Sequence, residues 1–170
     1  MNKFFRESIT HIPLFVLLLN FLHTDCLFGE WTNWRGPNFN GSSDYTGALP
    51  SKFDKQNSVK WSCSLPGPSA ATPIIFDDMV FLPSIQVNKL KGRGDGELLA
   101  LCLDKSNGEV LWKKNAGSGY KPGDSDGFDY QLHDRSNYAS PSPVISGKSV
   151  VFFYGNGDLI SFDFKGKENW

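Results

Sequence analysis

The feature that most constrains this chain is a pattern of apolar runs and turns that occurs twice. Each copy begins with a proline and two aliphatic residues, continues through apolar runs and ends in a turn followed by a tryptophan. The copies occupy about 69–113 and 139–170, and the first carries an additional polar loop, Gln86–Gly96. A repeat of this size is typical of stacked or radial arrays, in which each unit covers the apolar face of its neighbour.

The apolar runs within each copy predict short strands. They are rich in Val, Ile, Leu and Phe, lack a helical period and are separated by turn residues. Asn107-Gly108 and Asn156-Gly157 predict hairpins with type I′ turns, since both residue types tolerate positive φ. We therefore expect about four antiparallel strands in each copy. A four-stranded sheet repeated along an all-β chain indicates the blades of a β-propeller, and two hairpins of an ordinary sandwich are the alternative.

The turn that ends each copy resembles the tryptophan-docking motif of the pyrroloquinoline quinone (PQQ)-like β-propeller repeat. In that motif an Asp closes one strand, a turn containing Gly follows, and a Trp ends the next strand. The matching residues are Asp104, Asn107, Gly108 and Trp112 in the first copy and Asp163, Gly166 and Trp170 in the second, whose turn is one residue shorter.

Two further segments are similar to exported bacterial members of this family. Trp31–Asn38 looks like their Trp-Arg-Gly-Pro-Asn opening, and Ser136–Pro143 also looks like that group. Leu101–Leu103 departs slightly, since the family usually has Ala-Leu before the Asp. The resemblance covers essentially the whole chain after the first thirty residues, and it implies a fold without implying an activity.

The physical chemistry of the motif is consistent with this assignment. Asp can accept backbone N–H groups in the turn, and Gly supplies a left-handed residue. Burying the Trp between adjacent sheets is worth roughly 2–3 kcal/mol by area. Trp61 follows Val59 and Lys60 like a third such Trp, without the first half of a repeat before it. We expect Val59–Ser64 to be a strand that closes the last blade. Because rings need 4–8 blades, about two blades indicate a partial or truncated propeller, an N-terminal fragment of a longer one.

The N-terminus has the signature of a secretory signal peptide. Lys3 and Arg6 precede an apolar run over residues 12–22, which is too short to cross a bilayer. Cleavage after Gly29 would give an exported protein, periplasmic or extracellular; an uncleaved anchor or a buried strand is the alternative. The expected organisation is a signal peptide (1–29), an N-terminal extended segment (30–58) and a partial propeller (59–170), with its closing strand near 59–64 and blades at about 69–113 and 139–170.

Two cysteines, Cys63 and Cys102, remain after cleavage. In an oxidising compartment they could pair, but each lies in an apolar stretch where a free thiol acts as a small hydrophobic residue. Both alternatives stay open. The sequence contains no CxxC pair or Cys/His cluster for a structural zinc site.

Other candidate motifs favour solvated loops. A lone loop histidine, His133, is no basis for a catalytic triad or a metal site. The alternating carboxylates of Asp124–Asp129 lack the spacing and distal Glu of a calcium-binding EF-hand. Arg93–Asp95 is an Arg-Gly-Asp adhesion tripeptide, which we attribute to chance. It lies within a glycine-rich loop, Gly92–Gly96, whose glycine spacing does not predict a dinucleotide-binding site. Asn40–Ser42 is a formal glycosylation sequon, relevant only in a eukaryotic secretory pathway.

Charge and composition restrict the function. A formal net charge of −1 gives no electrostatic footprint for nucleic acid. No catalytic, cofactor-binding or metal-binding residue is assigned, and no transmembrane helix is expected in the mature chain. We expect a noncatalytic scaffold whose partners are other proteins or the remaining propeller blades, in protein interaction or envelope assembly. The alternative is the N-terminal part of a PQQ-dependent quinoprotein oxidoreductase, and only this alternative implies PQQ and calcium, held by residues outside the chain.

Overall fold

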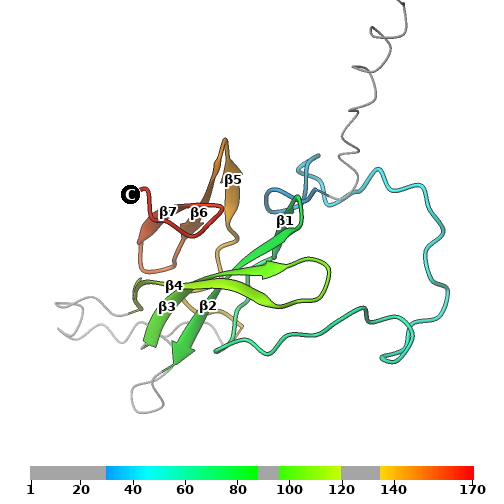
Figure 1. The fold of residues 1–170 in the computed structure, drawn as a ribbon, viewed down its shortest axis with the longest axis horizontal. Helices are drawn as coiled ribbons and strands as arrows, with labels where there is room; N and C mark the ends of the chain where they lie inside the picture. Colours follow the sequence, from blue (N-terminus) through cyan, green and yellow to red (C-terminus); the bar gives the residue numbers. More distant parts are fainter. Residues whose placement is uncertain (1–29, 88–95, 120–134) are drawn as a thin grey trace, which may run out of the picture.

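The computed structural model describes residues 30–87, 96–119 and 135–170, whose strands form two antiparallel sheets (Figure 1). The first sheet has the order β1-β2-β3-β4 and the second the order β5-β6-β7. The strands are β1 (Ile74–Phe76), β2 (Met79–Val87), β3 (Gly96–Asp104), β4 (Val110–Ser118), β5 (Val144–Ser146), β6 (Ser149–Phe153) and β7 (Leu159–Asp163). Within the described ranges there is no helix, which confirms the all-β prediction.

The second sheet has three strands where four were expected. Residues 168–170 begin to fill the fourth position, because Asn169 donates its backbone N–H to the Ser161 carbonyl at 2.9 Å and Ser161 donates to the Trp170 carbonyl at 2.9 Å. An isolated bridge also joins Phe162 to Glu168. This pairing is too short to form a strand, whereas the corresponding β4 of the first sheet has nine residues.

The prediction of type I′ turns was wrong. In both hairpins the glycine has positive φ, 78° at Gly108 and 92° at Gly157, but Asn107 and Asn156 do not. A type I′ turn requires positive φ at both central residues. Each Asn instead uses its side-chain Oδ1 to accept a backbone N–H two residues further along, at 2.8 and 3.0 Å. These Asx turns hold both Asn residues out of the left-handed region.

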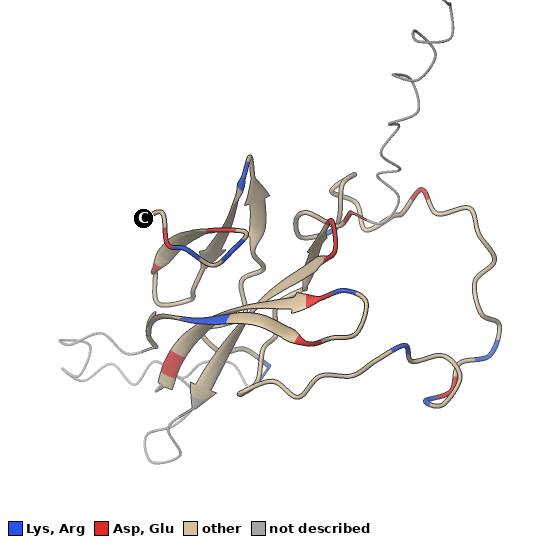
Figure 2. Ribbon diagram, in the orientation of Figure 1, with Lys and Arg blue, Asp and Glu red and all other residues tan. Residues whose placement is uncertain are grey.

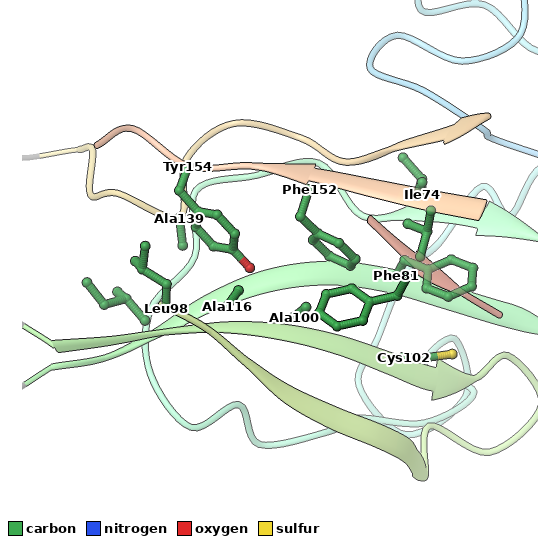
Figure 3. Packing of buried hydrophobic residues seen from close by; sticks show 12 residues of the cluster. Ile74, Phe81, Leu98, Ala100, Cys102, Ala116, Ala139, Phe152 and Tyr154 are labelled. Atoms are coloured by element: carbon green, nitrogen blue, oxygen red, sulfur yellow. The ribbon is translucent and has the colours of Figure 1, made fainter. Parts of the chain in front are cut away.

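The main core lies between the two sheets. Figure 3 shows Phe152 and Tyr154 of the second copy extending toward Phe81, Ala100 and Leu98 of the first sheet. The fully or almost fully buried side chains of this layer include Ile74, Phe81, Leu98, Ala100 and Cys102 from the first copy and Val150, Phe152, Tyr154 and Phe162 from the second. The alternation of strand side chains thus places one apolar face of each sheet against the other.

The opposite face of the first sheet carries a second, smaller core. Its buried members are Val80, Leu82, Leu101 and Leu103, and Trp61, Cys63 and Leu65 pack on them from the extended segment before β1. The predicted closing strand, Val59–Ser64, is therefore an extended segment lying on a sheet and is not itself a strand. No backbone–backbone hydrogen bond joins residues 59–65 to another part of the described chain.

The N-terminal segment reaches both sheets. Trp31 exchanges two backbone hydrogen bonds with Ile75 in β1, at 2.8 and 2.9 Å, and Ile145 in β5 donates to the Thr32 carbonyl at 3.0 Å. Residues 42–58 then run outside the sheets as a long extended excursion (Figure 1). Figure 2 shows Lys and Arg interspersed with Asp and Glu along the loops and strands, which agrees with the near-neutral net charge.

Candidate functional site

The turn after β3 is organised by the carboxylate of Asp104. Its Oδ1 accepts the backbone N–H of Ser106 at 2.7 Å and of Asn107 at 3.3 Å, and Gly108 donates its N–H to the Asp104 carbonyl at 2.8 Å. The hydrogen bond from the Ser106 side chain, together with these backbone N–H groups, lowers the pKa of Asp104. The carboxylate therefore shapes the turn.

The turn after β7 repeats this arrangement with one residue fewer. The Asp163 Oδ1 accepts the backbone N–H groups of Lys165 and Lys167 at 2.9 and 2.8 Å. Gly166 donates its N–H to the Asp163 carbonyl at 3.0 Å and has a φ of 79°. Both turns thus combine an Asp cap with a left-handed glycine.

An indole ring from the preceding unit rests on each of these turns. Trp112 of β4 donates its Nε1–H to the Phe164 carbonyl at 3.0 Å. A Cβ added to Gly166 would lie 2.9 Å from Cγ of Trp112. The ring also packs on Phe162, with the ring centroids 5.7 Å apart. Trp112 therefore joins the first sheet to the second at a position that only glycine leaves open.

Trp61 makes the same contact on the first sheet. Its Nε1–H donates to the Lys105 carbonyl at 2.8 Å, and a Cβ added to Gly108 would lie 2.4 Å from its Cε3 atom. The two acceptor residues occupy matching places, because each directly follows the Asp of its turn. Two indoles thus recognise the same pair of features, a turn carbonyl and a turn glycine.

The third indole of the pattern is different, because Trp170 is 57% exposed. It belongs to an apolar surface on the side of the second sheet that faces away from the first, which we call the uncovered face. The exposed members of this face are Val144 (41%), Phe153 (46%), Leu159 (54%) and Trp170. Phe153 and Leu159 are directly opposite each other in the β6–β7 register.

The corresponding face of the first sheet is covered. Ile74 and Ala100 occupy the places of Val144 and Leu159 in the repeat, and both are 0% exposed because the second sheet packs on them. The structure therefore leaves an apolar sheet face and a short strand edge beside β7 exposed. Surfaces of this kind can take part in binding through burial of apolar area and backbone hydrogen bonding.

The two cysteines do not pair. Both are free; Cys102 is buried in the core between the sheets, and Cys63 packs on the other face of the first sheet. The first sheet separates them, because the Cys102 side chain lies on the face toward the second sheet and Cys63 packs on the opposite face. Burial, with a smaller contribution from the charge of Asp104, raises the pKa of the Cys102 thiol to about 12.

Several predicted motifs lie outside the described residues: the signal peptide 1–29, Arg93–Asp95, Asp124–Asp129 and His133. Among the residues that the structure does describe, no group of three or more His, Cys, Asp or Glu side chains is placed to hold a metal ion. The described ranges also contain no helix long and apolar enough to cross a membrane. At the sequon, Asn40 is exposed and its Oδ1 accepts the Ser42 N–H at 2.9 Å.

Sequence reasoning missed two features of this region. One is the backbone pairing of Trp31 with the first sheet and of Thr32 with the second. No alternation of apolar and polar residues around these positions predicts it. The other is the hydroxyl of Tyr154, which is buried with no hydrogen-bond partner found in the described part of the chain. A Tyr in place of the Phe or Leu of neighbouring apolar runs was the available signal. Burial, with a contribution from the charge of Asp158, raises the pKa of Tyr154.

A scan against protein-family models finds no match to this chain, and a search of curated proteins finds none either.

Proposed function

We propose that this chain is part of an exported, noncatalytic β-propeller of the PQQ-like repeat type, which serves as a scaffold for protein interaction or envelope assembly. In this proposal each sheet is one blade, and the indole at the end of a blade fixes the next blade in place. The remaining blades or a protein partner cover the apolar surfaces that this chain leaves exposed.

The observation that carries the proposal is the repeated contact of an indole with a turn. Trp61 on Gly108 and Trp112 on Gly166 share the same donor atom, the same kind of acceptor carbonyl and the same close approach to glycine. Trp112 joins the first sheet to the second, and Trp61 makes the same contact with the first sheet from the segment before it. A radial array repeats one such contact from each unit to the next. An ordinary sandwich does not require the contact to recur on the outer face of the first sheet.

An experimental structure of the protein in its assembled state tests the propeller. We expect further four-stranded sheets arranged around an axis, with an indole on a turn glycine at every junction. A closed two-sheet sandwich in which Trp61 leaves Gly108 would contradict the proposal.

Export is the second component of the proposal, and its support is the charged and apolar pattern of residues 1–29. Cell fractionation with N-terminal sequencing tests it. We expect the protein outside the cytoplasm with Glu30 as its first residue. Full-length protein in the cytoplasm would overturn the assignment to the periplasm or the exterior.

The oxidoreductase alternative is separated from the scaffold by cofactor binding. The protein is titrated with PQQ and Ca²⁺, passed over a desalting column and examined for the quinone absorbance. We expect no absorbance to remain with the protein. Retention of a stoichiometric amount of quinone would replace the scaffold role by a quinoprotein role.

A further inference from the structure

The first strands of the two sheets are joined by the N-terminal segment at matching positions. Ile75 of β1 and Ile145 of β5 lie 70 residues apart, at the same place in the two copies of the repeat. Trp31 exchanges two backbone hydrogen bonds with Ile75, at 2.8 and 2.9 Å. The next residue, Thr32, accepts the N–H of Ile145 at 3.0 Å. Two consecutive residues thus pair with one and the same position in two successive repeats.

The segments that lead into β1 and β5 also touch each other at matching positions. Ser69 donates its side-chain hydroxyl to the Ala139 carbonyl at 3.2 Å, 70 residues further along the chain. Thr72 donates its backbone N–H to the Ser142 hydroxyl at 2.9 Å, again 70 residues further along. At this edge the two repeats therefore meet residue for matching residue.

Contacts between matching residues indicate where the axis of a radial array lies. In such an array, the distance between matching residues of neighbouring units grows in proportion to their distance from the axis. Hydrogen-bonded residues have Cα atoms roughly 5–7 Å apart, which puts them about 4–9 Å from the axis of a ring of 4–8 blades. At the opposite edge unlike positions meet, because Trp112 of β4 donates to the Phe164 carbonyl, 52 residues further along. With each sheet taken as one blade, the axis runs beside β1 and β5.

We propose that the N-terminal hook, residues 31–41, is an axial clamp. Its first two residues lie at the axis, where they bind the backbone edges of the innermost strands of two successive blades. The ligand class that such strand edges bind is an extended peptide, and here the chain supplies that peptide itself. The clamp rests on the proposed propeller and adds to it an occupant that closes this part of the axis to other ligands.

The hook is folded so that Trp31 is held in position. Its indole packs on Gly36, which has a φ of 73°, and a Cβ added there would lie 2.5 Å from Cζ3 of Trp31. Asn33 donates its side-chain amide to the Gly36 carbonyl at 2.9 Å, and Gly36 donates its backbone N–H to the Asn33 carbonyl at 2.9 Å. Trp31 is thus a third indole on a left-handed glycine, like Trp61 and Trp112. A hook that is already ordered loses less conformational entropy when it binds the strand edges.

The clamp protects two amide groups that the sheets leave unpaired. The N–H of Ile75 points away from β2 and the N–H of Ile145 points away from β6, because each donates to the hook. Without the hook, both would be edge amides open to exchange with solvent. Since consecutive residues of the hook hold them, we expect the two amides to be released together, although they lie in different sheets.

Hydrogen exchange of the full chain, measured at single amides, tests the clamp. Gly36→Ala displaces the Trp31 indole, and we expect the amides of Ile75 and Ile145 to exchange at least about tenfold faster. Gly41→Ala is the matched control. It imposes a left-handed alanine within the same hook, but no atom lies within 4 Å of the added Cβ. We expect both exchange rates to stay within about twofold of those of the parent chain.

Trp31→Ala is a second variant that leaves the packed interior intact, because Trp31 belongs to neither of the two apolar cores. It should release the same two amides, Ile75 and Ile145, while the amides of β3 keep their protection. Faster exchange of only one of the two amides, or of neither, would overturn the clamp. Equally faster exchange throughout β3 would also contradict it, because the hook would then stabilise the whole fold and not two strand edges.

An experimental structure of the assembled protein tests the axial position. We expect Thr32 to lie within about 10 Å of the ring axis. A ring that carries residues 31–32 at its outer rim would overturn the axial clamp and leave the scaffold proposal standing. A two-sheet sandwich without an axis would overturn the propeller and the axial clamp together, so the two kinds of failure are distinguishable.

Discussion

The two sheets present the same kind of apolar face, and only one of these faces is covered. On the first sheet Ile74 and Ala100 are fully buried under the second sheet, whereas Val144 and Leu159 hold the matching places on the second sheet and are about half exposed. The repeat therefore fixes which residues are apolar, and the presence of a neighbour decides whether they are buried. The contact between the two sheets therefore contributes to stability in addition to the pairing within each sheet.

The largest expected difference in stability between the two sheets is at the two equivalent tryptophans, Trp112 and Trp170. Trp112→Ala removes an indole that packs between the sheets and donates to Phe164, and we expect the free energy of unfolding to fall by about 3–5 kcal/mol. Trp170→Ala should cost less than about 1 kcal/mol in dilute solution, because the ring is largely exposed. Urea denaturation followed by circular dichroism measures both. Equal losses would show that the uncovered face is buried in solution.

The aliphatic pair gives the next largest difference. Ile74→Ala opens a cavity at a fully buried position, and we expect a loss of about 2–4 kcal/mol. Val144→Ala at the matching position, 41% exposed, should cost less than about 1 kcal/mol. The same denaturation experiment applies. A cost at Val144 that approaches the cost at Ile74 would contradict the difference in burial.

Substituting alanine for Gly166, with Gly41 as a control, tests whether the Trp112 indole needs a glycine in the turn. Gly166→Ala places a methyl group 2.9 Å from Trp112 and also imposes a left-handed conformation on alanine. Gly41→Ala imposes the same conformation with no atom within 4 Å. We expect about 1–2 kcal/mol of lost stability at Gly41 and a further 1–3 kcal/mol or so at Gly166. Thermal melting measures both variants. Equal losses of stability for the two variants would mean that the contact of Trp112 with this turn does not require a glycine at position 166.

The smallest effect is expected at Tyr154, between the two sheets. Tyr154→Phe removes a buried hydroxyl that has no hydrogen-bond partner in the described chain, so stability should be unchanged or rise by up to about 1 kcal/mol. Because the pKa of Tyr154 is raised, the unfolded state loses this proton first, and the stability of the parent chain should fall above about pH 10.

The Tyr154→Phe variant should lose this contribution to the alkaline slope. Denaturation midpoints between pH 8 and roughly 11 measure it, against the ordinary tyrosine pKa near 10. A variant that is less stable than the parent chain at neutral pH would mean that the hydroxyl has a partner.

Sequence reasoning reached the strands and their grouping because apolar runs and glycine turns are local signals. The β3–β4 and β6–β7 hairpins follow directly from the apolar runs on either side of Gly108 and Gly157. It failed on turn type, since the side-chain bonds of Asn107 and Asn156 compete with the backbone conformation that Asn-Gly favours in hairpins.

The candidate surface could be predicted only in part. The recurrence of Trp61, Trp112 and Trp170 predicts three indole contacts with neighbouring units, but sequence alone does not say that Trp112 is the one that joins the two sheets. The separation of Cys63 from Cys102 depends on which side of the first sheet the segment 59–65 covers, and that is a property of the packed fold. Long-range placement of this kind carries no local signal.

The hydrogen bonds of Trp31 and Thr32 have a consequence for biosynthesis. These residues leave the ribosome before either of the strands they contact, and Ile145 follows only after the whole first sheet has been made. Because these partners, Ile75 and Ile145, are made later, the N-terminal segment stays unpaired and accessible while the sheets form. If this segment pairs last, Trp31 and Thr32 remain accessible to proteases until β5 has been made and has paired with Thr32.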